Sequence, residues 1–302
     1  MCGIGGIYTL STGTYPRSQI GQLWHNLDNR GGHDAGISWL TRGSTKPRVL
    51  KRPLRAAKMQ QLYKREVGNK VQYAMLHTRY ATQGNIKQTG NNHPVVSHGI
   101  ILTHNGVLWN DDEIFTVTNA RRLHEVDSEA INVALRFYGI EWVADNLHGS
   151  MSIAWVDITK DTQVVNLFTN GQNPLVIGRT ISGHVVWAST KKHLAHMKLK
   201  SCFNATPFKL YKITPDGKIE SRYISDQREN CMDLDTIQYY RYSGESVKKT
   251  STLPLTTQDT KASLSDDVWW SEQDDYDWYK RNNNFHRLTD EEWSEKYGEE
   301  WR

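Results

Sequence analysis

The 302-residue chain has 37% hydrophobic residues and a formal net charge of +4, an apolar content too low for the whole length to contribute to a core. No run approaches the roughly 18 consecutive apolar residues of a membrane span, the N-terminus lacks a signal-peptide pattern, and three widely spaced cysteines exclude a disulfide framework. These features predict a cytoplasmic protein with one large domain or two small ones.

The order of strand and helix patterns indicates an α+β fold. In the first half these patterns are a buried strand at 4–10, an amphipathic helix at 17–27, a glycine-rich loop at 29–36 followed by a strand, a weaker helix around 54–67, and a strand at 71–81 that runs into a polar loop. In the second half they are a strand with a turn at 100–109, a helix from Asp127 to Gly139, a short helix at 140–147, four strands between 150 and 189, and a β-hairpin at 208–224 with a Pro-Asp-Gly turn. Runs of strands between helices favour a layered α+β domain over an alternating parallel sheet.

The pattern ends near residue 230. We expect a folded domain at 2–230, a polar linker at 231–264, and a tail at 265–302 that is partly disordered or docked. The tail holds 12 acidic and 5 basic residues and five of the eleven tryptophans, which leaves a net charge of +11 on residues 1–264. A basic body with an acidic tail predicts either an anionic partner or a tail that folds back.

Cys2 is the first candidate for chemistry. If the initiator methionine is removed, Cys2 carries both a thiol and a free α-amine. An amine has a pKa of about 7.7–8.0 and a thiol about 8.5, so the amine can act as general base for the attached thiol. The glycine-rich run that follows, GIGG, lets backbone pack closely around such a terminus. A small residue after Met is nevertheless common, so the position alone does not decide.

Three further segments have both a structural and a functional interpretation. In HTRYATQG (77–84), Arg79 is a solvated charge or a bidentate holder of a carboxylate. In HNG (104–106), Asn105 and Gly106 form a hairpin turn, which the segment alone favours, or donate together to an oxyanion. In DSE (127–129), Asp127 caps a helix or holds an ammonium group.

Metal, nucleotide and nucleic-acid sites receive little support. Four histidines (His77, His93, His98 and His104) fall within 28 residues, but their spacing matches no short ligand motif. We therefore predict no metal and no other cofactor. Neither a P-loop nor a dinucleotide fingerprint is present in its required context. Apart from a cluster between Lys46 and Arg65, the positive charge is scattered, so nucleic-acid binding is possible but not demanded.

Taken together, the motifs resemble the class II glutamine amidotransferases, which are N-terminal-nucleophile (Ntn) hydrolases with a cysteine as mature first residue. The resemblance covers roughly residues 2–225 and runs in the family's order through MCGIGG, RGGHDAG, HTRYATQG, NNHP, HNG, DSE, HGSMSIAWVD, NPLVIG and WAS. It implies a four-layer α-β-β-α sandwich, here followed by the C-terminal tail.

The resemblance also implies a role for each matching residue. The Cys2 thiolate attacks the side-chain amide of glutamine with help from its own amine, while Asn105 and Gly106 stabilise the oxyanion. The remaining residues bind substrate or lie close to the nucleophile: Arg79 holds the α-carboxylate, Asp127 holds the α-ammonium, Thr82 and His93 shape the pocket, and Arg30 lies near Cys2. Ammonia leaves, and water releases glutamate from the thioester.

The sequence departs from the family pattern at two loops. Tyr80 and Gln83 stand where members often have Trp and His. The acid that usually lies three residues after the loop arginine is replaced by His33, with Asp34 one later, so neither receives a role.

Family members usually continue into a synthase domain, whereas about 75 residues of linker and tail follow here. We therefore expect a glutaminase subunit that passes ammonia to a separate acceptor enzyme, with the tail as docking element. Modification of a deazapurine base, where ammonia is added to a nitrile, is one possible acceptor reaction. The alternatives are a γ-glutamyl amide or peptide hydrolase of the same fold and a non-catalytic regulatory module.

Overall fold

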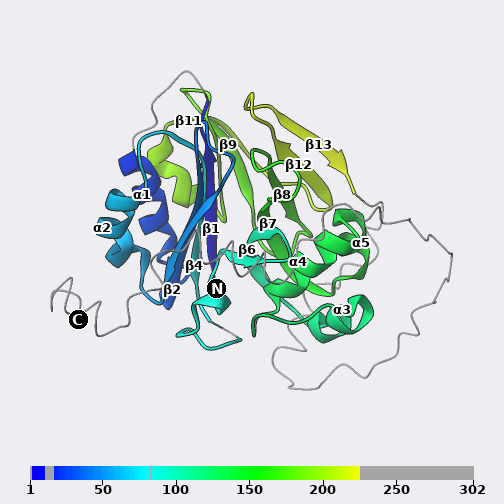
Figure 1. Cartoon of the computed structure of the whole chain (residues 1–302). Helices are drawn as coiled ribbons and strands as arrows, with labels where there is room; N and C mark the ends of the chain where they lie inside the picture. Colours follow the sequence, from blue (N-terminus) through cyan, green and yellow to red (C-terminus); the bar gives the residue numbers. More distant parts are fainter. Residues whose placement is uncertain (1, 11–16, 82, 225–302) are drawn as a thin grey trace.

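The computed structural model describes residues 2–10, 17–81 and 83–224. The predicted linker and tail, 231–264 and 265–302, lie outside the described residues, as does Thr82. Two antiparallel sheets stack face to face, and each is covered by helices on its outer side, which gives the four layers α-β-β-α (Figure 1). The expected α+β sandwich is thus confirmed.

The first sheet carries the N-terminal strand in its middle. Its seven strands run in the order β11-β9-β10-β1-β4-β2-β3, and every pair is antiparallel. They are β1 (Gly3–Tyr8), β2 (Asp34–Thr41), β3 (Arg48–Arg52), β4 (Val71–Arg79), β9 (Val176–Thr180), β10 (Val185–Ala188) and β11 (Leu199–Asn204). β1 is flanked by β10 and β4, and the pairing of Gly3 with Thr78 places residue 2 beside the end of β4.

The second sheet has six strands in the order β13-β12-β8-β7-β6-β5. They are β5 (Val95–Ser97), β6 (Ile100–Leu108), β7 (Gly149–Asp157), β8 (Val165–Thr169), β12 (Lys209–Ile213) and β13 (Ile219–Tyr223). The predicted hairpin at 208–224 is confirmed, with Gly217 in the turn at φ +75.

The helices form the two outer layers. The layer on the seven-stranded sheet holds α1 (Arg17–Leu27), α2 (Ala56–Glu66) and the 3-10 helix η2 (Lys191–Met197). The layer on the six-stranded sheet holds α3 (Asp111–Thr118), α4 (Ser128–Phe137) and α5 (Ile140–Asn146). A further 3-10 helix, η1, spans Thr89–Asn91. The first helix has apolar residues at helical spacing, and all four are buried against the seven-stranded sheet: Ile20, Leu23, Trp24 and Leu27. In the described part of the chain every helix is too short or too polar to span a bilayer.

Alternation along the strands decides which side chains meet between the sheets. On β1, Ile4 and Tyr8 lie in the core between the sheets, whereas Ile7 packs toward α1 and α2. On β4, Tyr73 and Met75 face inward, so His77 and Arg79, which follow at the same two-residue spacing, lie on the inner face as well.

The structure corrects several sequence-based expectations. Asn105 and Gly106 do not form a hairpin turn: they lie inside the continuous strand β6, paired with β7 from Ile100 to Leu108. The loop predicted at 29–36 ends earlier, because β2 begins at Asp34. Six elements were not predicted, namely β3, β5, α3, β11 and the 3-10 helices η1 and η2. They have three to eight residues, and a segment that short shows little periodicity of its own.

Candidate active site

Cys2 lies at the start of β1, two residues before the inward-facing Ile4. Its Sγ accepts a hydrogen bond from the backbone N–H of Tyr80 at 3.4 Å, and the Nε of Arg30 donates to the Cys2 carbonyl at 2.9 Å. Arg30 therefore contacts the backbone of Cys2. Burial raises the pKa of the Cys2 thiol, although the Tyr80 hydrogen bond lowers it. A buried thiol of this kind needs a nearby base to reach the thiolate form.

Arg79 ends β4 with its guanidinium already occupied by protein groups. Its Nη1 lies 3.3 Å from Asp34 Oδ2 and 3.1 Å from Asn92 Oδ1, and its Nη2 donates to the carbonyl of Gln83. The side chain is only 3% exposed, so the interpretation as a solvated charge is wrong. A substrate carboxylate would have to share this cation with Asp34.

Asp34 was left without a role by sequence reasoning, yet it lies directly opposite Arg79 in the β2–β4 pairing. It is fully buried, and its Oδ1 has no hydrogen-bond partner among the described residues. Burial raises the pKa of Asp34 to about 7, against the opposing effect of Arg79. No local motif reveals this pair, because only strand pairing brings the two residues together.

A second buried charge, Lys51 on β3, holds the segment 90–94. Its Nζ donates to the carbonyls of Asn92 at 2.8 Å, Pro94 at 3.0 Å and Gly90 at 3.4 Å. Burial lowers the pKa of Lys51 to about 7. On the neighbouring strand, any side chain at Gly36 would collide with the His93 carbonyl, so this segment lies directly on the sheet. In the sequence, Lys51 is only one of the basic residues clustered between Lys46 and Arg65.

The predicted site residue His93 lies against two further histidines, His77 and His104. The rings of His77 and His93 stack with centroids 4.1 Å apart, and His77 Nε2 donates to the His104 carbonyl across the two sheets at 3.0 Å. Burial lowers the pKa of His77 to about 3 and also lowers the pKa values of His93 and His104. The lowered pKa values favour the neutral form of all three rings.

Ser128 fixes the tautomers of the other two rings. His104 Nε2 donates to the Ser150 carbonyl at 3.2 Å, so its Nδ1 accepts from Ser128 Oγ at 2.9 Å. The hydroxyl has one proton, so His93 Nε2 donates to Ser128 Oγ at 3.0 Å. Within the ranges that the structure describes, no group of three or more His, Cys, Asp or Glu side chains is arranged to hold a metal ion.

Asn105 extends from β6 toward the strand that carries Cys2. Its Nδ2 donates to Ser189 Oγ at 2.8 Å, and Ser189 in turn bonds to both backbone groups of Ile4. Gly106 has φ +155, and a Cβ there would meet the Ser150 carbonyl and the His104 ring, so only glycine fits. The two predicted oxyanion donors are thus adjacent on a rigid strand.

Asp127 precedes α4 but does not cap it through its side chain. Instead its Oδ2 accepts from the backbone N–H of Leu108 at 2.8 Å, and its Oδ1 lies 3.2 Å from Ser128 Oγ. Asp127 thus occupies the N-cap position of α4, as the structural interpretation predicts, but its carboxylate makes no capping hydrogen bond. The carboxylate faces the end of β6, two residues beyond Gly106.

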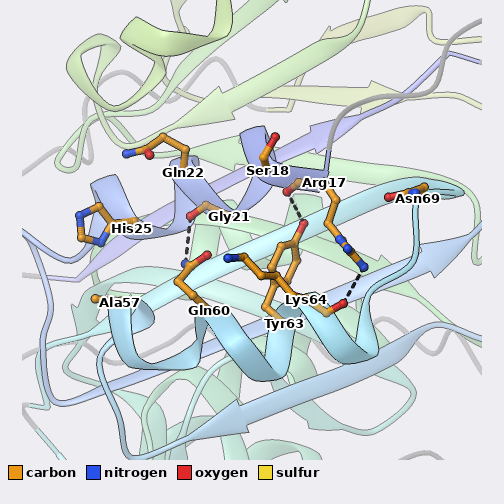
Figure 2. Close-up of a pocket in the computed structure, with 10 residues that line it drawn as sticks. All are labelled: Arg17, Ser18, Gly21, Gln22, His25, Ala57, Gln60, Tyr63, Lys64 and Asn69. Atoms are coloured by element: carbon orange, nitrogen blue, oxygen red, sulfur yellow. Dashed lines mark hydrogen bonds between the residues drawn. The ribbon is translucent and has the colours of Figure 1, made fainter.

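A cleft between α1 and α2 lies apart from the residues discussed above. It has a volume of about 730 Å³ and is lined by Arg17, Ser18, Gly21, Gln22, His25, Ala57, Gln60, Tyr63, Lys64 and Asn69 (Figure 2). Hydrogen bonds from Tyr63 to the Arg17 carbonyl and from Gln60 to the Gly21 carbonyl tie the two helices together. It lies on the outer side of the seven-stranded sheet and contains none of the predicted site residues.

Residues 77–196 match the family model of a glutamine amidotransferase domain. This range includes Arg79, His93, Asn105, Gly106 and Asp127, which the structure arranges at one end of the two sheets. Over this range the chain is similar to glutamine amidotransferase domains. Cys2 and Arg30 lie outside the matched range and join the domain through β1 and its hydrogen bonds.

Individual proteins resemble this amidotransferase domain in sequence or in fold. Glutamine–fructose-6-phosphate aminotransferase (isomerizing) from Xylella fastidiosa (strain 9a5c) is 38% identical over 86 residues, which is 28% of this chain and 14% of that protein. The structure of glutamine phosphoribosylpyrophosphate (PRPP) amidotransferase from B. subtilis, complexed with ADP and GMP, has a TM-score of 0.61 at 21% identity. It covers 74% of this chain and 50% of that one.

A second solved structure, that of the allosteric regulatory enzyme of purine biosynthesis, has a TM-score of 0.62 at 20% identity, over 74% of this chain and 49% of its own. Both solved structures support the fold described above. The chain spans about one seventh of the length of the curated relative and about half of each solved chain.

Proposed function

We propose that this chain hydrolyses the side-chain amide of glutamine through Cys2, giving glutamate and ammonia for a separate acceptor enzyme. The observation that carries the proposal is the position of Cys2: its Sγ lies on the Tyr80 N–H, directly after Arg79, and its strand is hydrogen-bonded through Ser189 to Asn105. A nucleophile, an amide donor and a cation from distant segments therefore meet at one site.

The reaction proceeds in two covalent steps. The α-amine of Cys2, free once Met1 is removed, takes the thiol proton, and the sulfur forms a bond to the amide carbon of glutamine. The amide C–N bond then breaks, the nitrogen takes the proton, and ammonia leaves. Water attacks the thioester, the C–S bond breaks, and glutamate and the free thiol are restored.

The surrounding residues hold the substrate and its developing charge. The second Nδ2 hydrogen of Asn105 and the Gly106 N–H stabilise the oxyanion of each tetrahedral intermediate. Arg79 attracts the α-carboxylate, Asp127 attracts the α-ammonium, and Thr82 and His93 shape the pocket. These roles are supported by the burial of Arg79 and Asp127 beside the strands that carry Cys2 and Asn105.

The acceptor of the ammonia stays a prediction. We expect a separate enzyme, and a nitrile of a deazapurine base is one acceptor that fits the chemistry. Mixing the purified chain with a candidate acceptor enzyme and ¹⁵N-amide glutamine would trace the nitrogen into the product. Labelled ammonia found only in solution would argue against transfer.

The central experiment measures glutamate release and intact mass on untagged protein. We expect a mass short by one methionine, glutamate formation with glutamine, and activity near background in Cys2→Ala and Cys2→Ser. Cys202→Ala is the matched control, because Cys202 is also a partly buried free thiol but lies on β11. A γ-glutamyl peptide cleaved faster than glutamine would favour the γ-glutamyl hydrolase, and processed protein without any turnover would favour the regulatory module.

A further inference from the structure

Ser189 connects the two sheets at the expected reaction centre. It follows the last residue of β10, is fully buried, and its backbone N–H donates to the Ile4 carbonyl at 2.9 Å. Its hydroxyl accepts from the Ile4 N–H at 3.0 Å and from Asn105 Nδ2 at 2.8 Å, and lies 3.2 Å from the Ile4 carbonyl. One side chain thus joins the strand of Cys2 to the side chain of Asn105.

The hydrogen-bonding capacity of this hydroxyl is completely used. A serine hydroxyl has one proton to donate and two lone pairs to accept with. Here the proton points to the Ile4 carbonyl, and the two lone pairs receive the Ile4 N–H and one Asn105 N–H. Because an amide side chain is planar, fixing one of its N–H bonds also fixes the direction of the other. The Asn105 Oδ1 has no hydrogen-bond partner among the described residues, so Ser189 is the contact that orients this amide.

We infer that Ser189 is a positioning residue that aims the free N–H of Asn105 at the oxyanion formed during glutamine hydrolysis. The inference rests on the proposed function. Oxyanion stabilisation depends on donors that are fixed before the reaction, whereas the terminal torsion of an unrestrained asparagine is broad. Since Ser189 also bonds to Ile4, it sets the position of the donor relative to the strand of the nucleophile.

The kinetic test is a double-mutant cycle with Asn105→Ala, Ser189→Ala and the double variant. We expect Ser189→Ala to lower kcat by about 10- to 100-fold, part of the effect typical of a lost oxyanion donor, with little change in KM. In the Asn105→Ala background the same substitution should change kcat by less than about twofold, because the group it orients is gone. Ser189→Thr retains the hydroxyl and should recover most of the activity.

A matched control is available at the far edge of the six-stranded sheet. Ser97 is also a fully buried serine whose Oγ accepts from an asparagine amide, that of Asn132, at 3.0 Å. Ser97→Ala should lower thermal stability as Ser189→Ala does and leave kcat unchanged. A multiplicative loss in the Ser189/Asn105 double variant would overturn the inference, as would an unchanged kcat in Ser189→Ala.

A turnover-independent measurement separates this inference from the proposed function. In protein labelled with ¹⁵N-asparagine, the Asn105 side-chain signals are identified by their loss in Asn105→Ala. We expect one of its two amide protons to exchange slowly with solvent in the wild type and rapidly in Ser189→Ala. Unchanged exchange overturns the positioning role even in an active enzyme. Wild-type protein that releases no glutamate overturns the proposed function and the catalytic effect of Ser189. The exchange rates then still decide whether Ser189 holds the Asn105 amide in place.

Discussion

At the scale of single residues, the site combines a buried thiol with charges that are already paired. Burial raises the pKa of Cys2, and Arg79 shares its guanidinium with Asp34, Asn92 and Gln83. Neither arrangement suits a reactive group exposed to water. Both suit a pocket in which the α-amine activates the thiol and the substrate carboxylate joins an arginine that is held in one orientation.

Asn105→Ala tests the oxyanion donor. We expect kcat to fall by about 10²–10³, the loss typical of one removed donor, while the fold is retained. Steady-state kinetics and circular dichroism provide the measurement. Asn166→Ala is the control, because Asn166 is a buried asparagine on β8 whose amide donates to the Trp155 carbonyl. Near-normal turnover in Asn105→Ala would remove Asn105 from this role.

Asp34→Asn tests whether the buried carboxyl opposite Arg79 holds a proton. Its pKa is raised to about 7 in the folded state, against about 3.9 in an unfolded chain. A raised folded-state pKa means that Asp34 contributes stability that is complete below the unfolded value and is lost as pH rises toward 7.

In Asp34→Asn the side chain at position 34 does not titrate, so this loss of stability with rising pH is absent. The free energy of unfolding of the variant relative to wild type should therefore increase by up to about 1.4 kcal/mol per pH unit between pH 4 and 6. Lys51, with a pKa of about 7, stays charged in that window. Denaturant titrations at several pH values provide the measurement. A difference independent of pH would show that Arg79 and Lys51 keep Asp34 ionised.

At the scale of elements, the segment 90–94 depends on a strand that it does not join. Lys51 on β3 donates to three of its carbonyls, and His93 within it stacks on His77 of β4. The segment that contains His93, the residue expected to shape the pocket, is therefore held in place by the buried amine of Lys51. The hydrogen bonds of Asn92 with Lys51 and with Arg79 extend this support to the arginine.

Lys51→Met should loosen this segment. The variant keeps an apolar stem of similar length but leaves buried carbonyls without a donor, each at a cost of about 1–3 kcal/mol. We expect a lower free energy of unfolding and a higher KM for glutamine, because Arg79 and His93 lose their support. Lys58→Met, on the exposed side of α2, is the control. An unchanged KM in a destabilised Lys51→Met protein would confine Lys51 to a structural role.

At the scale of the whole molecule, hydrogen bonds join the two sheets at both ends of an apolar core. Near Cys2, His77 of β4 donates to the carbonyl of His104 on β6, and Ser189 connects β1 to Asn105 on β6. At the opposite end of β1, Tyr8 donates to the carbonyl of Gln163. The contacts near Cys2 connect the sheet that carries Cys2 to the sheet that carries Asn105.

Removing residues 265–302 tests the expected division of labour along the chain. Cys2, Asn105 and their neighbours all lie within residues 2–224, so we expect the shortened chain to release glutamate at the wild-type rate. Ammonia transfer and complex formation with the acceptor should decrease. Changing Asp274, Asp275 and Asp277 to Asn separates the effect of charge from that of length. Unaltered complex formation in the shortened chain would contradict a docking role.

The sequence by itself determined the elements with long, regular patterns and the residues of the family motifs. The helix at 17–27, the strand at 71–79 and the α+β layering follow from periodicity, because apolar spacing dictates which face of an element is buried. The motif order also singled out Cys2, Arg79, Asn105, Gly106 and Asp127.

Only the tertiary structure decided how these residues are held. Asn-Gly became part of a strand instead of a turn because β7 pairs along its whole length. Asp34 and Ser189 lie in the motifs RGGHDAG and WAS, but no local pattern shows what they or Lys51 contact. Each acts on a residue at least 39 positions away through strand pairing or a contact between sheets. Such contacts depend on register and layer spacing, which a one-dimensional pattern does not contain.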